Sequence, residues 1–151
     1  MMVVLVSAPI LAGCDHAPRA DPVAQTTTTG SPGELLGAWQ STGAGDALLM
    51  YRFDADGGYT HTSVLVRQRP SGLFSQGVRV SGSVDVDGER LVLRPEDGAV
   101  TLTDPGSPGS SYTNRPMTDL SAAEYTWMLS PDGDLGLTEA ASGKTVTYRR
   151  L

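Results

Sequence analysis

The stretch VRVSGSVDVDGERLVLRP, residues 78–95, decides the fold of this chain. In its first half valines alternate with mostly polar residues, and in its second half Leu91 and Leu93 share one face. Asp87 and Gly88 separate the two halves. An Asp-Gly pair between alternating runs is a strong hairpin signal, because glycine takes the positive φ that the turn needs. The stretch therefore predicts two antiparallel strands joined by a tight turn.

The same pattern recurs from Glu34 to Leu151, where alternating segments are separated by Asp-Gly and similar turn pairs. It predicts about eight short strands and no sustained helix. Because sequential hairpins form a meander whose edges must be covered, we expect an all-β, antiparallel, up-and-down barrel, closed or nearly closed. A two-sheet β-sandwich is the alternative. The side chains expected to share the buried faces are Leu49, Tyr51, Phe53, Val100, Leu102, Tyr125, Trp127, Leu129, Leu135, Leu137, Val146 and Tyr148.

The chain starts with an uncharged apolar run, VVLVSAPIL, at residues 3–11. A membrane-spanning helix needs about 20 such residues, so this run is typical of a secretory signal. It ends in Leu11-Ala12-Gly13-Cys14, which resembles the lipobox of bacterial lipoproteins and contains the only cysteine. The resemblance implies cleavage before Cys14 and attachment of diacylglycerol to its thiol. We would then expect an exported protein, anchored by lipid to the cell membrane or outer membrane of a bacterium and facing the periplasm or the exterior.

Three regions follow from these patterns. Residues 1–13 are expected to be the signal peptide, residues 14–33 the lipidated cysteine and a tether, and residues 34–151 the barrel domain. The tether is rich in Pro, Thr and Gly, a composition that buries too little apolar surface to fold. His16 is expected to be a solvated residue within it.

A second resemblance concerns the start and the end of the predicted barrel. Gly37-Ala38-Trp39 is similar to the Gly-x-Trp motif that opens the first strand of lipocalin-like (calycin) barrels. Those barrels place an arginine of the last strand across the tryptophan, and Arg149 or Arg150 occupies that position here. The resemblance implies that Trp39 plugs one barrel end under a guanidinium, which is a structural closure rather than a catalytic site.

Charge and motifs exclude several classes of function. The net charge of -6 argues against a nucleic-acid partner, because binding to phosphates needs clustered Lys and Arg. Asp54 with Asp56 and Asp85 with Asp87 resemble fragments of calcium loops, but neither continues to a bidentate Glu. We interpret both as hairpin turns and expect no metal site. His61, the only histidine of the domain, is expected to be a half-buried polar strand residue.

Two loops are candidates for contacts. Leu73 and Phe74 lie between turn residues in QRPSGLFSQG, residues 68–77, and either line the barrel mouth, touch a partner, or fold back onto the barrel end. The stretch 104–119 is long for a hairpin connection and rich in Gly, Ser and Pro. Such a stretch is either a disordered insertion or a functional lid.

These observations favour a noncatalytic lipoprotein. The leading hypothesis is binding of a small apolar or amphipathic ligand in the barrel. The alternative is an interaction or scaffold lipoprotein with a filled core, which binds a protein or envelope partner through its loops. No catalytic or phosphate-binding motif is evident, so we expect no enzymatic activity and no cofactor. A hydrolase, the remaining alternative, would depend on His61.

Overall fold

The computed structural model describes residues 31–43 and 45–151, which form a closed antiparallel β-barrel with one additional strand. No helix in these two ranges combines the length and the apolar character that crossing a bilayer requires. The elements are α1 (Pro32–Leu35), β1 (Gly37–Ser41), β2 (Ala47–Phe53), β3 (Gly58–Arg69), β4 (Gly72–Asp87), β5 (Arg90–Thr103), the 3-10 helix η1 (Pro108–Ser110), β6 (Tyr112–Pro116), β7 (Ala123–Leu129), β8 (Leu135–Glu139) and β9 (Thr145–Arg150).

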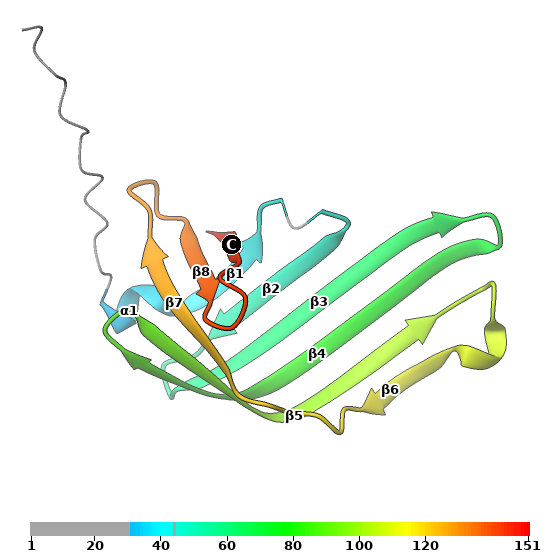
Figure 1. The fold of residues 1–151 in the computed structure, drawn as a ribbon, viewed down its shortest axis with the longest axis horizontal. Coiled ribbons are helices and arrows are strands. Elements are labelled where there is room, and N and C mark those ends of the chain that lie inside the picture. Colours follow the sequence, from blue (N-terminus) through cyan, green and yellow to red (C-terminus); the bar gives the residue numbers. More distant parts are fainter. Residues whose placement is uncertain (1–30, 44) are drawn as a thin grey trace, which may run out of the picture.

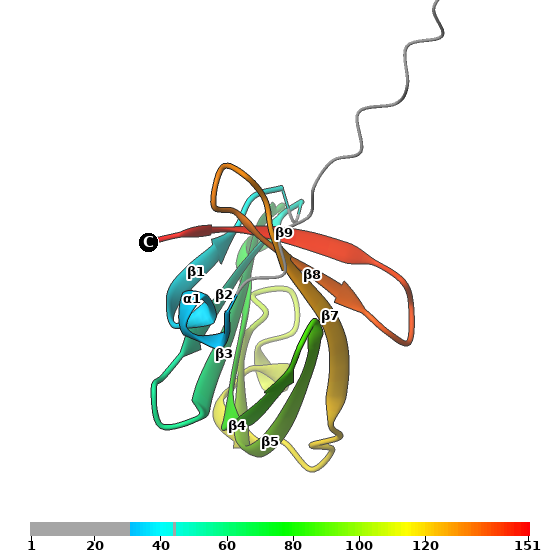
Figure 2. The same ribbon diagram turned by 90° about the vertical axis from the view of Figure 1, so that its left-hand side faces the viewer.

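The strands of the barrel follow one another in chain order. β1 pairs with β2 on one side and with β9 on the other, and the pairing of β4 with β5 closes the ring. Figure 2 shows this ring from the end near α1. The all-β, up-and-down barrel predicted from the hairpin pattern is therefore confirmed. The β-sandwich alternative is wrong, because the hydrogen bonding continues from strand to strand around one closed sheet.

Three strands are longer than the short strands that the sequence predicts. β3 pairs with β4 along its whole length, from Gly58 opposite Ser83 to Arg69 opposite Gly72. β5 pairs with β7 near its start and with β6 near its end. As Figure 1 shows, β3, β4 and β5 consequently run past the other strands and form, with β6, a sheet that extends beyond the barrel.

The stretch 104–119 contains η1 and the whole of β6. The expectation of a disordered insertion is therefore wrong. β6 is held by backbone pairing with β5, and the Asp104 N–H donates to the Ser111 hydroxyl at 2.9 Å. Sequence composition suggested disorder because Gly, Ser and Pro dominate the stretch, but pairing with the long β5 supplies the ordering contacts.

The interior near α1 is filled by two tryptophans. Trp39 and Trp127 are almost completely buried, and their indole N–H groups donate to the carbonyls of Leu35 at 2.7 Å and Gly88 at 2.9 Å. Buried indoles need such partners, so these bonds fix both rings. The buried apolar side chains of this core are Leu35, Trp39, Tyr51, Phe53, Tyr59, Leu91, Leu93, Trp127, Leu135, Leu137 and Tyr148.

Gly82 marks the point where β4 bends against β5. The register between the two strands shifts at Ser81 and Gly82, as in a β-bulge. A Cβ atom at position 82 would overlap the carbonyl oxygen of Arg94 and lie 2.8 Å from the Cα of Pro95. Only glycine therefore allows the two backbones to approach this closely.

Candidate functional site

One end of the barrel is closed by Trp39 and Arg150. The guanidinium of Arg150 lies over the indole ring, 4.3 Å from its centroid. Its Nη1 donates to the carbonyl of Leu36 at 2.7 Å, and its Nη2 donates to the carbonyl of Glu34. The last strand is thus tied to the α1 segment across the mouth of the barrel.

Two cavities lie toward the opposite end. Cavity A has a volume of about 190 Å³ and cavity B of about 230 Å³. Glu139 and Lys144, which flank the β8–β9 turn, line cavity B, whereas Arg150 at the far end of β9 marks the closed end. Cavity A is lined by Tyr51, Tyr59, His61, Val80, Leu93, Pro95, Met117, Asp119, Leu120, Ser121, Ala123 and Tyr125. Cavity B is lined by Leu49, Tyr51, His61, Ser63, Tyr125, Leu137, Glu139, Lys144, Val146 and Tyr148.

Tyr51, His61 and Tyr125 belong to the walls of both cavities. Strand pairing brings Tyr51 directly opposite His61, and their rings stack with centroids 4.5 Å apart. The ring of Tyr148 meets the Tyr51 ring edge-on at 5.4 Å. Because aromatic pairs favour these stacked and edge-to-face geometries, the shared wall is held in place by its own packing.

Burial keeps the histidine and the buried tyrosines of the cavity lining uncharged near neutral pH. It lowers the pKa of His61, so the imidazole is neutral. It raises the pKa of Tyr51 and of Tyr148, with a further contribution from Tyr125, and raises the pKa of Tyr59 to about 12. The tyrosine hydroxyls and the imidazole therefore present hydrogen-bonding groups without formal charge.

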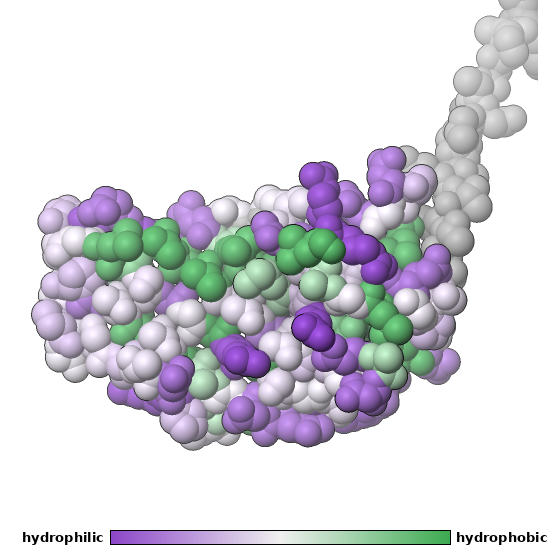
Figure 3. Space-filling model, turned by 180° about the vertical axis from the view of Figure 1, so that it is seen from behind, coloured by the Kyte–Doolittle hydropathy of each residue, from purple (hydrophilic) through white to green (hydrophobic). Residues whose placement is uncertain are grey.

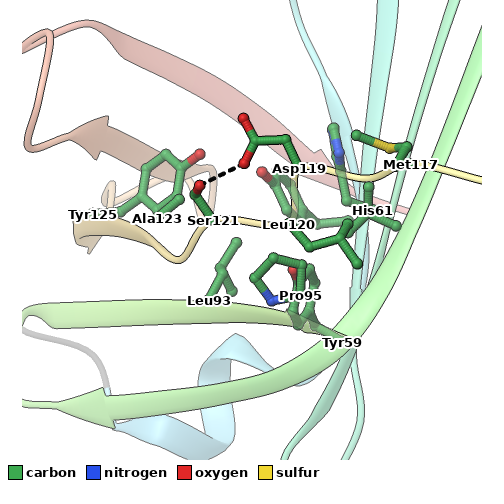
Figure 4. A pocket seen from close by; sticks show the side chains of 12 residues that line it. Tyr59, His61, Leu93, Pro95, Met117, Asp119, Leu120, Ser121, Ala123 and Tyr125 are labelled. Atoms are coloured by element: carbon green, nitrogen blue, oxygen red, sulfur yellow. Dashed lines mark hydrogen bonds between the residues drawn. The ribbon is translucent and has the colours of Figure 1, made fainter. Parts of the chain in front are cut away.

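The connector between β6 and β7 covers part of cavity A, as Figure 4 shows. The N–H of Met117 donates to the carbonyl of Gly98 at 2.9 Å. A Cβ at Gly98 would lie 3.0 Å from the sulfur of Met117 and 3.1 Å from Leu120, so the connector packs closely on this glycine. Further along, the Ser121 hydroxyl donates to a carboxylate oxygen of Asp119 at 2.7 Å at the edge of the cavity.

Ser121, Asp119 and His61 all line cavity A, a combination that includes a hydroxyl, a carboxylate and an imidazole. A nucleophilic serine needs a base that takes its proton, usually an adjacent imidazole. Here the Ser121 hydroxyl donates to Asp119. His61 instead stacks on Tyr51. The arrangement is that of polar groups at the edge of an aromatic cavity.

Leu73 and Phe74 lie on opposite sides of β4. Phe74 is buried beneath the guanidinium of Arg69, which lies 3.8 Å from the centre of its ring. Leu73 is 54% exposed. Neither residue lines cavity A or cavity B.

The sequence offered two arginines, Arg149 and Arg150, as the partner of Trp39. Arg150 covers Trp39, whereas Nε of Arg149 lies 3.7 Å from a carboxylate oxygen of Asp134.

The paired aspartates of the turns make local contacts. A carboxylate oxygen of Asp54 accepts a hydrogen bond from Arg52 at 2.8 Å, and Asp85 pairs with Arg94. Asp56 accepts a hydrogen bond from the backbone within its own turn. Within residues 31–43 and 45–151, no group of three or more His, Cys, Asp or Glu side chains is arranged to hold a metal ion.

The expected lipidation site, Cys14, lies outside the described residues, as do the rest of the lipobox at residues 11–13 and His16. Cleavage and lipidation stay predictions from the sequence. α1 begins at Pro32, just before the expected start of the domain at Glu34.

Sequence reasoning did not identify the cavities. It placed Tyr51, Tyr125 and Tyr148 on buried faces, where the structure also has them, but it assigned them no site. Several inward tyrosines in one barrel are a usable signal, because a buried hydroxyl needs a polar partner or a polar space. The position of Asp119 at the cavity could not be predicted from the sequence, because only the path of the connector between β6 and β7 brings it there.

Comparison of the chain with protein-family models, with curated proteins and with solved structures finds no match.

Proposed function

We propose that this chain is a noncatalytic, lipid-anchored protein of the bacterial cell envelope that binds a small apolar or amphipathic molecule in its barrel. The observation that carries the binding role is the pair of aromatic cavities on either side of Tyr51, His61 and Tyr125. The lipobox-like sequence ending at Cys14 supports the anchor.

The size and lining of the cavities suit a small amphipathic molecule. An apolar cavity of about 150 Å³ holds one benzene ring, so cavities of about 190 and 230 Å³ each accommodate one ring or a group of similar volume. Ligand sites are mostly apolar with a few convergent polar groups. Here tyrosine hydroxyls and the neutral His61 supply those groups, and the opposite barrel end is closed by Trp39 and Arg150.

Filling cavity A tests the binding role. Ala123 lines cavity A, and its neighbour Ala122 is exposed and does not. We expect the purified full chain to bind benzyl alcohol, detected by saturation-transfer NMR. Ala123→Phe should weaken this binding at least tenfold, whereas Ala122→Phe should leave it unchanged. Equal binding by both variants would contradict binding in cavity A.

The anchor has its own test. Cells that express the chain are grown with a clickable palmitate analogue, and the protein is examined for label. We expect label on the unaltered chain and none on Cys14→Ser, because the thiol is the proposed site of attachment. Label that persists in Cys14→Ser would contradict the anchor without affecting the binding role.

A second candidate function is an interaction protein that uses the outside of the barrel. Leu48 and Val66 are 36% and 46% exposed, and Leu48 lies opposite Val64 on the neighbouring strand. Figure 3 shows an apolar band that runs along the length of the molecule. Exposed apolar surface of this kind marks contact sites in many proteins. This function predicts that Val66→Ser weakens partner binding while Ala123→Phe does not.

A further inference from the structure

We propose that cavity A holds the cationic headgroup of an organic ammonium ligand, with the rings of Tyr51, Tyr59 and Tyr125 as its walls and Asp119 as its counter-charge. This assignment rests on the proposed binding function and specifies the chemical class of the ligand.

The walls of cavity A are suited to an ammonium group. Three tyrosines from β2, β3 and β7 and the imidazole of His61 line one small space. Aromatic rings carry partial negative charge on their faces, and aromatic side chains gathered around one space form the kind of site that recognises quaternary ammonium groups. Because His61 is neutral, it adds no opposing positive charge.

The charge at the rim has the complementary sign. Of the described residues that line cavity A, Asp119 is the one with a formal charge, and neither Lys nor Arg is among them. The Ser121 hydroxyl donates to a carboxylate oxygen of Asp119 at 2.7 Å, which orients the carboxylate. Glu96 is close enough to contribute to the raised pKa of Tyr59, so a second negative charge acts on the same region. An anionic ligand would meet repulsion here.

The volume of cavity A also fits such a headgroup. A trimethylammonium group is similar in bulk to a benzene ring, and a cavity of about 150 Å³ is sufficient for benzene. Cavity A, at about 190 Å³, holds the headgroup but not a long hydrocarbon chain as well. The rest of the ligand would therefore leave through the mouth beside Asp119.

Cavity B has a different charge pattern. Glu139 and Lys144 both line it, so it offers one charge of each sign. That lining gives no net preference for a cation. The two cavities share aromatic residues, and the contrast between them isolates the carboxylate of Asp119 as the feature that would select an ammonium ligand.

A pair of matched ligands tests this assignment. Choline and 3,3-dimethylbutan-1-ol have nearly the same shape, but only choline is charged. We expect the purified full chain to bind choline at least tenfold more tightly than the neutral analogue, measured by NMR titration. Asp119→Asn should reduce the affinity for choline several-fold and leave the affinity for the neutral analogue unchanged.

Asp132→Asn is the matched control, because Asp132 is an exposed turn residue that lines neither cavity. It should leave the affinity for choline unchanged. Equal or tighter binding of the neutral analogue, or an unchanged choline affinity in Asp119→Asn, would overturn the ammonium assignment. The binding of benzyl alcohol, and its loss in Ala123→Phe, would then still support the proposed function. Failure of choline, its neutral analogue and benzyl alcohol to bind would overturn both.

Discussion

The guanidinium of Arg150 lies 4.3 Å from the centre of the Trp39 ring and also donates to the carbonyl of Leu36. Trp39 and Arg150 are direct partners across β1 and β9, which are the first and last strands of the barrel. One side chain therefore joins the two ends of the folded chain, covers a buried indole, and binds the backbone of the segment that enters the barrel.

Removing this guanidinium should destabilise the barrel. Arg150→Ala loses the stacking and the charged hydrogen bonds, so we expect the free energy of unfolding to fall by about 1–3 kcal/mol. Arg149→Ala is the control, because Arg149 makes only a long, exposed ion pair with Asp134 and should cost less than about 1 kcal/mol. Urea unfolding of both variants measures the difference, and an equal loss would show that Arg150 has no special role in closure.

His61 should make stability depend on pH. Burial lowers the pKa of His61 in the folded protein below its ordinary value of about 6.5, so the unfolded chain binds the proton more readily. The free energy of unfolding should therefore decrease as pH falls below about 6.5 and be independent of His61 above that value.

His61→Gln removes the titrating group and should flatten the part of this profile that lies below about pH 6.5. His16→Gln, at the only other histidine, is the control and should retain the slope. Urea unfolding between pH 5 and 8 measures all three proteins. Profiles of the same slope in His61→Gln and in the unaltered chain would show that burial of His61 has no effect.

Gly82 should tolerate no side chain. Gly82→Ala places a methyl group against the backbone of Arg94 and Pro95, so we expect the free energy of unfolding to fall by about 1–3 kcal/mol. Gly77 lies on the same strand with open space around its Cβ position. Gly77→Ala should therefore change stability by less than about 1 kcal/mol. Equal midpoints of thermal unfolding for the two variants would contradict the close approach of β4 and β5.

Much of the barrel could be predicted because alternation and turn chemistry are local. The alternation around Tyr51 and Trp127 identified the buried sides of β2 and β7, and Asp87-Gly88 identified a turn whose glycine has a φ of 58°. A meander of such hairpins has few ways to cover its edges, which favoured a closed or nearly closed barrel over a two-sheet sandwich.

The long strands and the site could not be predicted in the same way. The hydrogen-bonded pairing of β3 with β4 extends as far as Arg69 opposite Gly72. Alternation within one strand does not indicate the length over which a second strand pairs with it. β6 forms because β5 offers it an edge, which the composition of residues 104–119 does not indicate. Asp119 reaches cavity A through the path of the connector, a relation that appears only in three dimensions.

Binding inside the barrel is tested most directly by NMR titration of the isotopically labelled full chain with benzyl alcohol. We predict that the side-chain signals of His61 and Tyr125 shift with saturation and show nuclear Overhauser contacts to the ligand. Signals of Leu48 and Val66 on the outer face should not move. Shifts confined to Leu48 and Val66, with His61 and Tyr125 unaffected, would contradict a binding site within the barrel.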